Sequence, residues 1–265
     1  MALVPDRGRP IFPLQENVDI HQGGTKPKAT YDLALYEELG SNGTKAVLEV
    51  TTIIVFSFTD GSSAWTKQEK VDFMAEASRE IPKAWGEKFE IRTTNPTPPA
   101  KVAGVIFNVV TKDGGELGFK WGHGHWNVAC RKVDAPRPSD TSLGGGSCCT
   151  NGSANWDSRD LTLETPYGAS TSIKQRGAVH EYGHMLGYRD EYADPTGRKG
   201  DPRYSAAHPS DEKSILFYGE EVRPRHYVLL ADWISLKWIA KDSKNCKAHD
   251  WKVDGKIDLL NAGLS

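Results

Sequence analysis

Residues 46–59 read AVLEVTTIIVFSFT and form the most strand-like stretch of this chain. Valine, isoleucine and threonine dominate it, and their β-branched side chains suit the pleated surface of a sheet. The turn-forming run DGSS follows directly at residues 60–63. We therefore expect residues 46–59 to be a principal strand of the fold.

A helix is predicted downstream of this strand, because Thr66 and Glu69 have the spacing of a capping box. Small and apolar residues then recur at helical spacing and predict one face turned towards the core. That face comprises Val71, Met74, Ser78, Ile81 and Trp85. Pro82 is expected to kink the last turn or to shorten it.

Three more strands are predicted at residues 89–93, 102–111 and 125–133. In the last of these, buried and polar positions alternate, as in a half-buried strand. Residues 134–168 contain a glycine run and predict a long irregular segment. Two further helices are expected, one over residues 171–186 and one from Pro224 to about residue 240.

Residues 1–44 are rich in proline, glycine and polar side chains and predict an irregular, partly extended arm before a domain spanning residues 45–265. This arm is interpreted as a docking segment, a pro-region or a wrapped terminus. Residues 1–15 lack the apolar core of a secretory signal peptide. This pattern is compatible with a cytoplasmic protein, or with an effector that a specialised secretion apparatus recognises through the arm.

The composition excludes some classes of partner. The 265 residues include 33 basic and 35 acidic side chains, so neither nucleic acid nor an anionic membrane is expected to bind through charge. No apolar run is long enough to cross a bilayer. The four cysteines, Cys130, Cys148, Cys149 and Cys246, are compatible with buried thiols or with one or two disulfides.

The segment that carries chemistry reads HEYGHMLGYRD at residues 180–190. On a helix, residues four apart share one face, so His180 and His184 can direct both imidazoles at one point. Gly187 can adopt the left-handed conformation that ends a helix, which would turn Asp190 back towards the histidines. Two imidazoles and one carboxylate leave a fourth position on Zn2+ for water, as in catalytic zinc sites. Glu181 is then placed to act as the general base.

This segment resembles the zinc signature of the metzincin peptidases, HExxHxxGxx followed by His or Asp. A second similarity is SILFYG at residues 214–219, which resembles the clan's methionine-containing turn, with Leu216 in the methionine position. Leucine is close to methionine in volume, so an apolar floor beneath the ligands is expected to persist. By resemblance, Tyr218 would approach the zinc and stabilise the oxyanion.

The resemblance implies an α+β fold with an α/β-like N-terminal lobe and a twisted mixed sheet. The active-site helix would end an upper lobe at residues 45–187, and a smaller, mostly helical lower lobe would follow at residues 188–265. The implied function is a zinc metalloendopeptidase that binds a protein or peptide substrate along a sheet edge, for which residues 125–133 are the candidate. The alternatives are a non-catalytic, metal-stabilised binding or effector module, and a hydrolase of non-peptide amides.

Other residues near the motif have less specific patterns. His123 and His125 could bind a metal, but histidines at strand ends are usually solvated. Glu191 and Asp194 are alternative carboxylate ligands, although Glu191 is better interpreted as a partner of a ligand histidine or of Arg189. Three more residues, interpreted either as substrate contacts or as a solvated helix start, are Arg223, Arg225 and His226.

Overall fold

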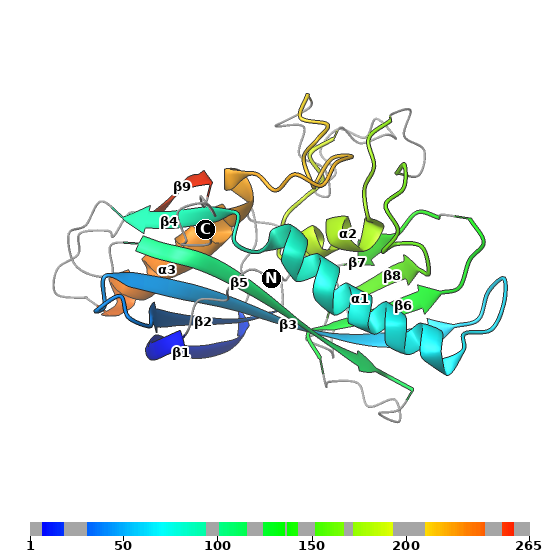
Figure 1. Cartoon of the computed structure of the whole chain (residues 1–265), viewed down its shortest axis with the longest axis horizontal. Coiled ribbons are helices and arrows are strands. Elements are labelled where there is room, and N and C mark those ends of the chain that lie inside the picture. The colour runs from blue at the N-terminus through cyan, green and yellow to red at the C-terminus, as the bar shows by residue number, and fades with distance from the viewer. Residues whose placement is uncertain are drawn as a thin grey trace, which may run out of the picture.

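The computed structural model describes residues 7–18, 31–93, 101–115, 124–135, 137–142, 152–166, 172–192, 210–241 and 251–256. These residues form a mixed α+β fold, in which a twisted sheet of nine strands is accompanied by few helices (Figure 1). The expected α+β class is therefore confirmed. Among the described helices, none has both the length and the apolarity that a membrane span requires.

The strands are β1 (Arg7–Val18), β2 (Tyr31–Glu38), β3 (Lys45–Thr59), β4 (Phe89–Thr93), β5 (Lys101–Asp113), β6 (Trp126–Arg131), β7 (Asp140–Ser142), β8 (Gly152–Asp157) and β9 (Trp251–Lys256). The helical elements are α1 (Lys67–Trp85), α2 (Gly177–Met185), the 3-10 helix η1 (Pro224–Tyr227) and α3 (Val228–Lys241).

Strand β3 organises the sheet, as the sequence predicts. One of its edges pairs in parallel with β5, and its other edge pairs first with antiparallel β2 and then with parallel β6. The path through the sheet is β7-β8-β6-β3-β5-β4-β9. Because β3 has neighbours along both edges and is largely buried, its sequence is an almost continuous apolar run.

The described part of the N-terminal arm is extended, as expected, but the prediction that it is irregular and precedes the domain is wrong. The described part of residues 1–44 forms β1 and β2, and β2 continues the sheet against β3. Leu33 and Leu35 of β2 are completely buried in the core. Proline and glycine around these strands concealed their apolar content, although an edge strand such as β1 tolerates proline. The structure does not test the predicted division into lobes at residue 187.

The segment at residues 134–168 is not irregular throughout, because it contains β7 and β8. Strand β8 alternates buried Gly152, Ala154 and Trp156 with exposed Ser153 and Asn155. Small and polar residues dominate this strand, so β-propensity does not reveal it. The proposed edge at residues 125–133 is also wrong, since β6 lies between β3 and β8. On this side of the described sheet, β7 is the edge strand.

Helix α1 begins with the predicted capping box, but its core face differs from the predicted one. Val71 is 46% exposed, whereas Phe73 is buried against Phe56, Phe58 and Trp65. This aromatic cluster turns the helix so that its buried residues are Phe73, Ala77, Glu80, Ile81 and Trp85. Helical periodicity permits both stripes, and only packing against the sheet distinguishes them.

The helical segments meet over one side chain of the sheet. Phe107 of β5 contacts Trp85 of α1, Tyr182 of α2 and Tyr227 of η1 through ring centroids 6.1–6.3 Å apart. Trp85 Nε1 also donates to the carbonyl oxygen of Val179 at 2.9 Å, which joins α1 to α2. Helix α2 is therefore fixed between the sheet, α1 and η1, and it is shorter than the predicted helix at residues 171–186.

The start of α1 provides a test of this fold through pH. Lys132 Nζ donates to the Glu69 carboxylate at 2.7 and 2.8 Å, and the Thr66 amide donates at 2.8 Å. These hydrogen bonds, and chiefly the one from Lys132, lower the pKa of Glu69 from 4.5 to about 2. Since the folded pKa is depressed, this stabilisation is present above pH 4.5 and is lost as the pH falls through 2.

We therefore expect Glu69→Gln to be less stable than the wild type at neutral pH, with the difference disappearing on acidification towards pH 2. Urea unfolding at a series of pH values measures this difference. Glu76→Gln on the same helix is the matched control, because its ion pair with Arg79 is longer, at 3.7 Å. A difference that persists at the lowest pH would contradict the assignment.

Candidate metal centre

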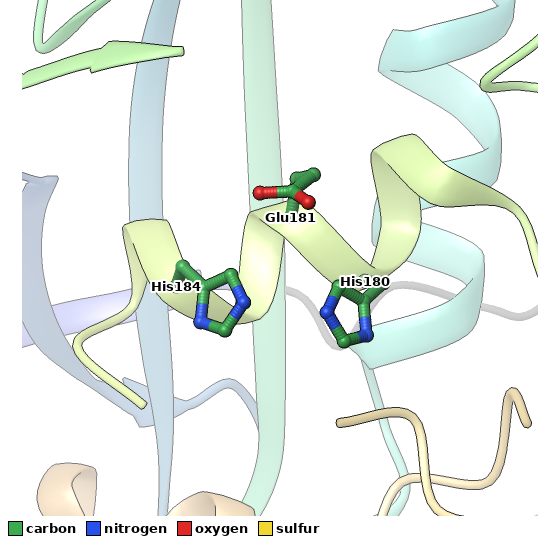
Figure 2. Close-up of side chains that lie close together, drawn as sticks. All are labelled: His180, Glu181 and His184. Carbon is green, nitrogen blue, oxygen red and sulfur yellow. The ribbon is translucent and has the colours of Figure 1, made fainter. Parts of the chain in front are cut away.

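Helix α2 presents its two histidines on one side. His180 and His184 are one turn apart, with ring centroids separated by 5.0 Å, and Figure 2 shows both imidazoles projecting from the same side of the helix. His180 is buried and His184 is nearly so. The helical spacing therefore brings the two rings together, as expected from the sequence.

Two backbone carbonyl groups orient these rings. Nδ1 of His180 lies 2.9 Å from the oxygen of Ile215, and Nδ1 of His184 lies 2.9 Å from the oxygen of Tyr188. A carbonyl oxygen can only accept, so each Nδ1 must carry a proton and donate it. A neutral imidazole has a single such proton, which leaves a lone pair on each Nε2. Metal-binding histidines typically donate their other ring N–H to a carbonyl or carboxylate oxygen in this way.

Asp190 joins the two histidines after a turn at Gly187. Gly187 has φ of 95°, the left-handed conformation that the sequence predicts for the helix end. Asp190 Oδ1 then lies 3.0 Å from His180 Nε2 and 3.3 Å from His184 Nε2. The structure thus brings together all three side chains that the sequence predicts as ligands.

The contacts of Asp190 fit a bound cation. Its Oδ1 atom is buried and makes no hydrogen bond within the described part of the chain. With both imidazoles neutral, Oδ1 and the two Nε2 atoms are three electron-rich atoms that face one another. This arrangement is unfavourable unless a positive charge, from a proton or a cation, lies between them. Two imidazole nitrogens and a carboxylate oxygen are a donor set that suits zinc.

The pKa values reflect the same demand for positive charge. Burial alone would lower the pKa of His184, but the negative charge of Asp190 outweighs it and raises this pKa to about 10. Burial opposes ionisation of Asp190, yet the two imidazoles hold the pKa of this carboxyl well below its usual range. A proton or a metal ion can supply the charge, so the two are expected to compete.

Glu181 lies beside this centre and is held by an unexpected partner. One of its carboxylate oxygens falls within 4.8 Å of the ligand nitrogens of His180 and His184. Thr141 Oγ1, on the edge strand β7, donates to Glu181 Oε2 at 2.6 Å. Glu181 is therefore a second carboxylate near the imidazoles, but its Oε2 atom is hydrogen-bonded to β7. Asp190 Oδ1 instead lies next to the Nε2 atoms of both histidines.

The turn at residues 214–219 lies against α2, as the sequence predicts for a floor. Leu216 is buried, and a Cβ atom on Gly183 would lie only 2.5 Å from its Cδ2 atom. Glycine at position 183 therefore permits the turn to pack directly on the helix between the two histidines. Gln175 Nε2 also donates to the carbonyl oxygens of Ile215 at 3.0 Å and Gly219 at 2.6 Å. These bonds hold the turn against the segment that precedes α2.

Tyr218 lines a cavity of about 180 Å³ that also reaches His180 and Glu181. The ring of Tyr218 stacks on Tyr192 with centroids 5.7 Å apart, and Phe217 contacts both rings. The remaining lining residues are Arg137, Pro138, Ser139, Arg159, Asp160, Thr162, Glu164, Thr165, Pro166, Gln175 and Gly177. Glu181, the candidate base, and Tyr218, the predicted oxyanion donor, thus line the same cavity.

Glu191 does not have either of the partners expected for it. Its carboxylate accepts from Ser214 Oγ at 2.5 Å, from Arg225 at 2.5 and 2.6 Å, and from His226 Nε2 at 3.1 Å. Burial opposes its ionisation, but these donors hold the pKa of Glu191 well below its usual range. Because Glu191 follows Asp190 directly, this network anchors the segment that carries the third candidate ligand.

The same network corrects the interpretation of the three residues after the turn. Arg223 and Arg225 both bond to Asp211, at 2.6–2.9 Å, and His226 is only 1% exposed. The two arginines are thus committed to ion pairs and His226 to a buried hydrogen bond with Glu191, rather than to a solvated helix start. Sequence reasoning missed this role because Asp211 and Glu191 are distant in the chain.

His125, directly before β6, is buried, so the expectation of a solvated histidine is wrong. Its Nδ1 accepts from the amide of Ile53 at 2.9 Å, and its Nε2 lies 3.0 Å from Asp32 Oδ1. Cys130 is a buried free thiol, and burial is the main cause that raises its pKa. The other residues named in the sequence analysis that lie outside the described ranges are His123, Cys148, Cys149, Asp194 and Cys246.

Comparisons with known proteins add no assignment. A scan of family models finds no match to this chain, and a search of curated proteins finds no similar sequence. The metzincin similarity therefore remains a resemblance of motifs.

Replacing each carboxylate separately tests which one is the third ligand. We expect the wild type to bind one equivalent of Zn2+, and Asp190→Ala to weaken binding by more than the roughly 100-fold caused by loss of an outer hydrogen-bond partner. Glu181→Ala should bind Zn2+ almost as well as the wild type. Competition with a chromophoric chelator measures both affinities, and the opposite order would make Glu181 the ligand.

Proposed function

We propose that this chain is a zinc-dependent endopeptidase of the metzincin type. The observation that carries the proposal is the approach of His180 Nε2, His184 Nε2 and Asp190 Oδ1 to one another, beside a cavity that Glu181 also lines. A ligand set of three protein atoms leaves one position of a tetrahedral zinc for water, as catalytic rather than structural sites do. When bound, zinc would polarise the substrate carbonyl and lower the pKa of a coordinated water.

Glu181 is the proposed general base. Its Oε2 atom accepts a hydrogen bond from Thr141, whereas its Oε1 atom accepts none from the described residues. Oε1 is therefore available to accept a proton from the attacking water, and the same carboxyl group can later pass this proton to the leaving amine. Burial of Glu181 at the cavity wall keeps competing bulk water away from that transfer.

Tyr218 is the proposed oxyanion donor. Its ring is braced by Tyr192 and Phe217, and it lines the same cavity as Glu181. A phenol hydroxyl directed into this cavity can donate to the carbonyl oxygen as negative charge develops there. The proposal thus assigns the proton transfer and the charge stabilisation to two different residues of this chain.

The proposed substrate is a protein or peptide in extended conformation. Since β6 is internal, β7 replaces it as the candidate edge for pairing with a substrate strand. Thr141 of β7 contacts Glu181, so a peptide added to this edge would lie beside the base and the histidines. The cavity lined by Tyr218 would then receive one substrate side chain.

Glu181→Gln tests the base. The amide keeps the size of the side chain but cannot take up a proton, so we expect kcat to fall by about 10²–10⁴. Zinc content should stay at the wild-type level. Cleavage sites and rates are measured on a peptide library, with and without a chelator. Undiminished cleavage by Glu181→Gln would exclude the proposed base, and a zinc-loaded wild type that cleaves no peptide would favour the non-catalytic alternative.

Tyr218→Phe tests the oxyanion donor. Loss of the hydroxyl should lower kcat by about 10²–10³, the range found for loss of one oxyanion donor, with KM little changed. The aromatic contacts with Tyr192 and Phe217 are retained by phenylalanine, so folding should be unaffected. Steady-state kinetics on the best library peptide provide the measurement. A change confined to KM would indicate a binding role for Tyr218 instead.

A further inference from the structure

Thr141 on β7 contacts the candidate base through its side chain. We propose that Thr141 is a positioning residue, which holds Glu181 in one orientation with one carboxylate oxygen free for proton transfer. This inference rests on the proposed function, and it goes beyond it by assigning a role to the edge strand itself. No sequence motif marks Thr141, since it is 40 positions from Glu181.

The contact defines which oxygen is available. Thr141 Oγ1 lies 2.6 Å from Glu181 Oε2 and 3.4 Å from the backbone oxygen of the same residue. A hydroxyl has one proton to donate, and the shorter distance directs it to the carboxylate. Hydrogen bonds to a charged acceptor are short and directional, so this bond limits rotation of the Glu181 side chain.

A pair of buried carboxylates fixes the strand that carries Thr141. Ser139 Oγ lies 2.7 Å from each carboxyl oxygen of Asp160, and the amide of Arg137 donates to Asp157 Oδ2 at 2.9 Å. Thr141 itself pairs with Ala154 of β8. The approach to β7 is therefore tied to the end of β8, which gives the hydroxyl of Thr141 a defined place.

The same arrangement couples the edge strand to the base. The Thr141 side chain is directed at α2, whereas the backbone of β7 on the side away from β8 has no partner strand among the described residues. A peptide that pairs with this edge would restrain β7 further. Thr141 would transmit that restraint to Glu181 through a single hydrogen bond, and thus would align the base when substrate is bound.

Thr141→Val and Thr141→Ser form the test. Valine keeps the shape of threonine without the hydroxyl, so we expect kcat to fall roughly 10- to 100-fold, as for a small misplacement of a catalytic group. KM, zinc content and unfolding temperature should stay at wild-type values. Thr141→Ser keeps the hydroxyl and should restore most of kcat. Thr111→Val is the matched control, because this strand threonine bonds to Ser78 at 3.1 Å away from the site.

A crystal structure of each zinc-loaded variant gives a readout that needs no activity. The proposal requires one conformer of Glu181 in the wild type and several conformers, or a different one, in Thr141→Val. An unchanged Glu181 conformer in Thr141→Val overturns the proposal, whether or not the wild type cleaves peptides. A parallel loss of zinc or of stability also overturns it, since Thr141 would then be structural. Absence of peptide cleavage in the wild type with the expected change of conformer would reject the proposed function alone.

Discussion

Two hydrogen bonds set the orientation of the histidines on helix α2. The carbonyl oxygens of Ile215 and Tyr188 each accept from an Nδ1 atom, so the lone pairs of both Nε2 atoms are turned towards Asp190. With the opposite tautomer, each Nε2 would carry a proton and could not bind a metal. The site therefore depends on backbone groups from a turn and from a helix end, which side-chain substitution cannot remove.

The surrounding fold keeps these backbone groups in place by several independent contacts. Gln175 holds the carbonyl groups of the turn, and Leu216 packs on Gly183 of the helix. Trp85 of α1 donates to the backbone of α2 and also packs against Gly183. Because each contact comes from a different segment, the two histidines keep their orientation even though the helix that carries them spans only Gly177–Met185.

Charges are distributed around the centre in two separate groups. Asp190 faces the histidines, whereas the adjacent Glu191 is paired with the charged Arg225 and accepts a hydrogen bond from His226. On the other side of α2, the carboxylate of Glu181 is shared between the cavity and β7. Neighbouring acidic residues thus serve different purposes, and only their partners in the folded chain distinguish a candidate ligand, a candidate base and a structural anchor.

Features that arise within a few residues of chain could be predicted without a structure. The spacing of residues 180–190 and the glycine turn predicted the approach of His180, His184 and Asp190, and residues 46–59 predicted the central strand. The sequence did not reveal that residues 7–18 and 31–38 join the sheet, that β7 is an edge strand, or that Thr141 contacts Glu181. Local spacing follows from backbone geometry, whereas these pairings are selected by packing between segments far apart in the chain.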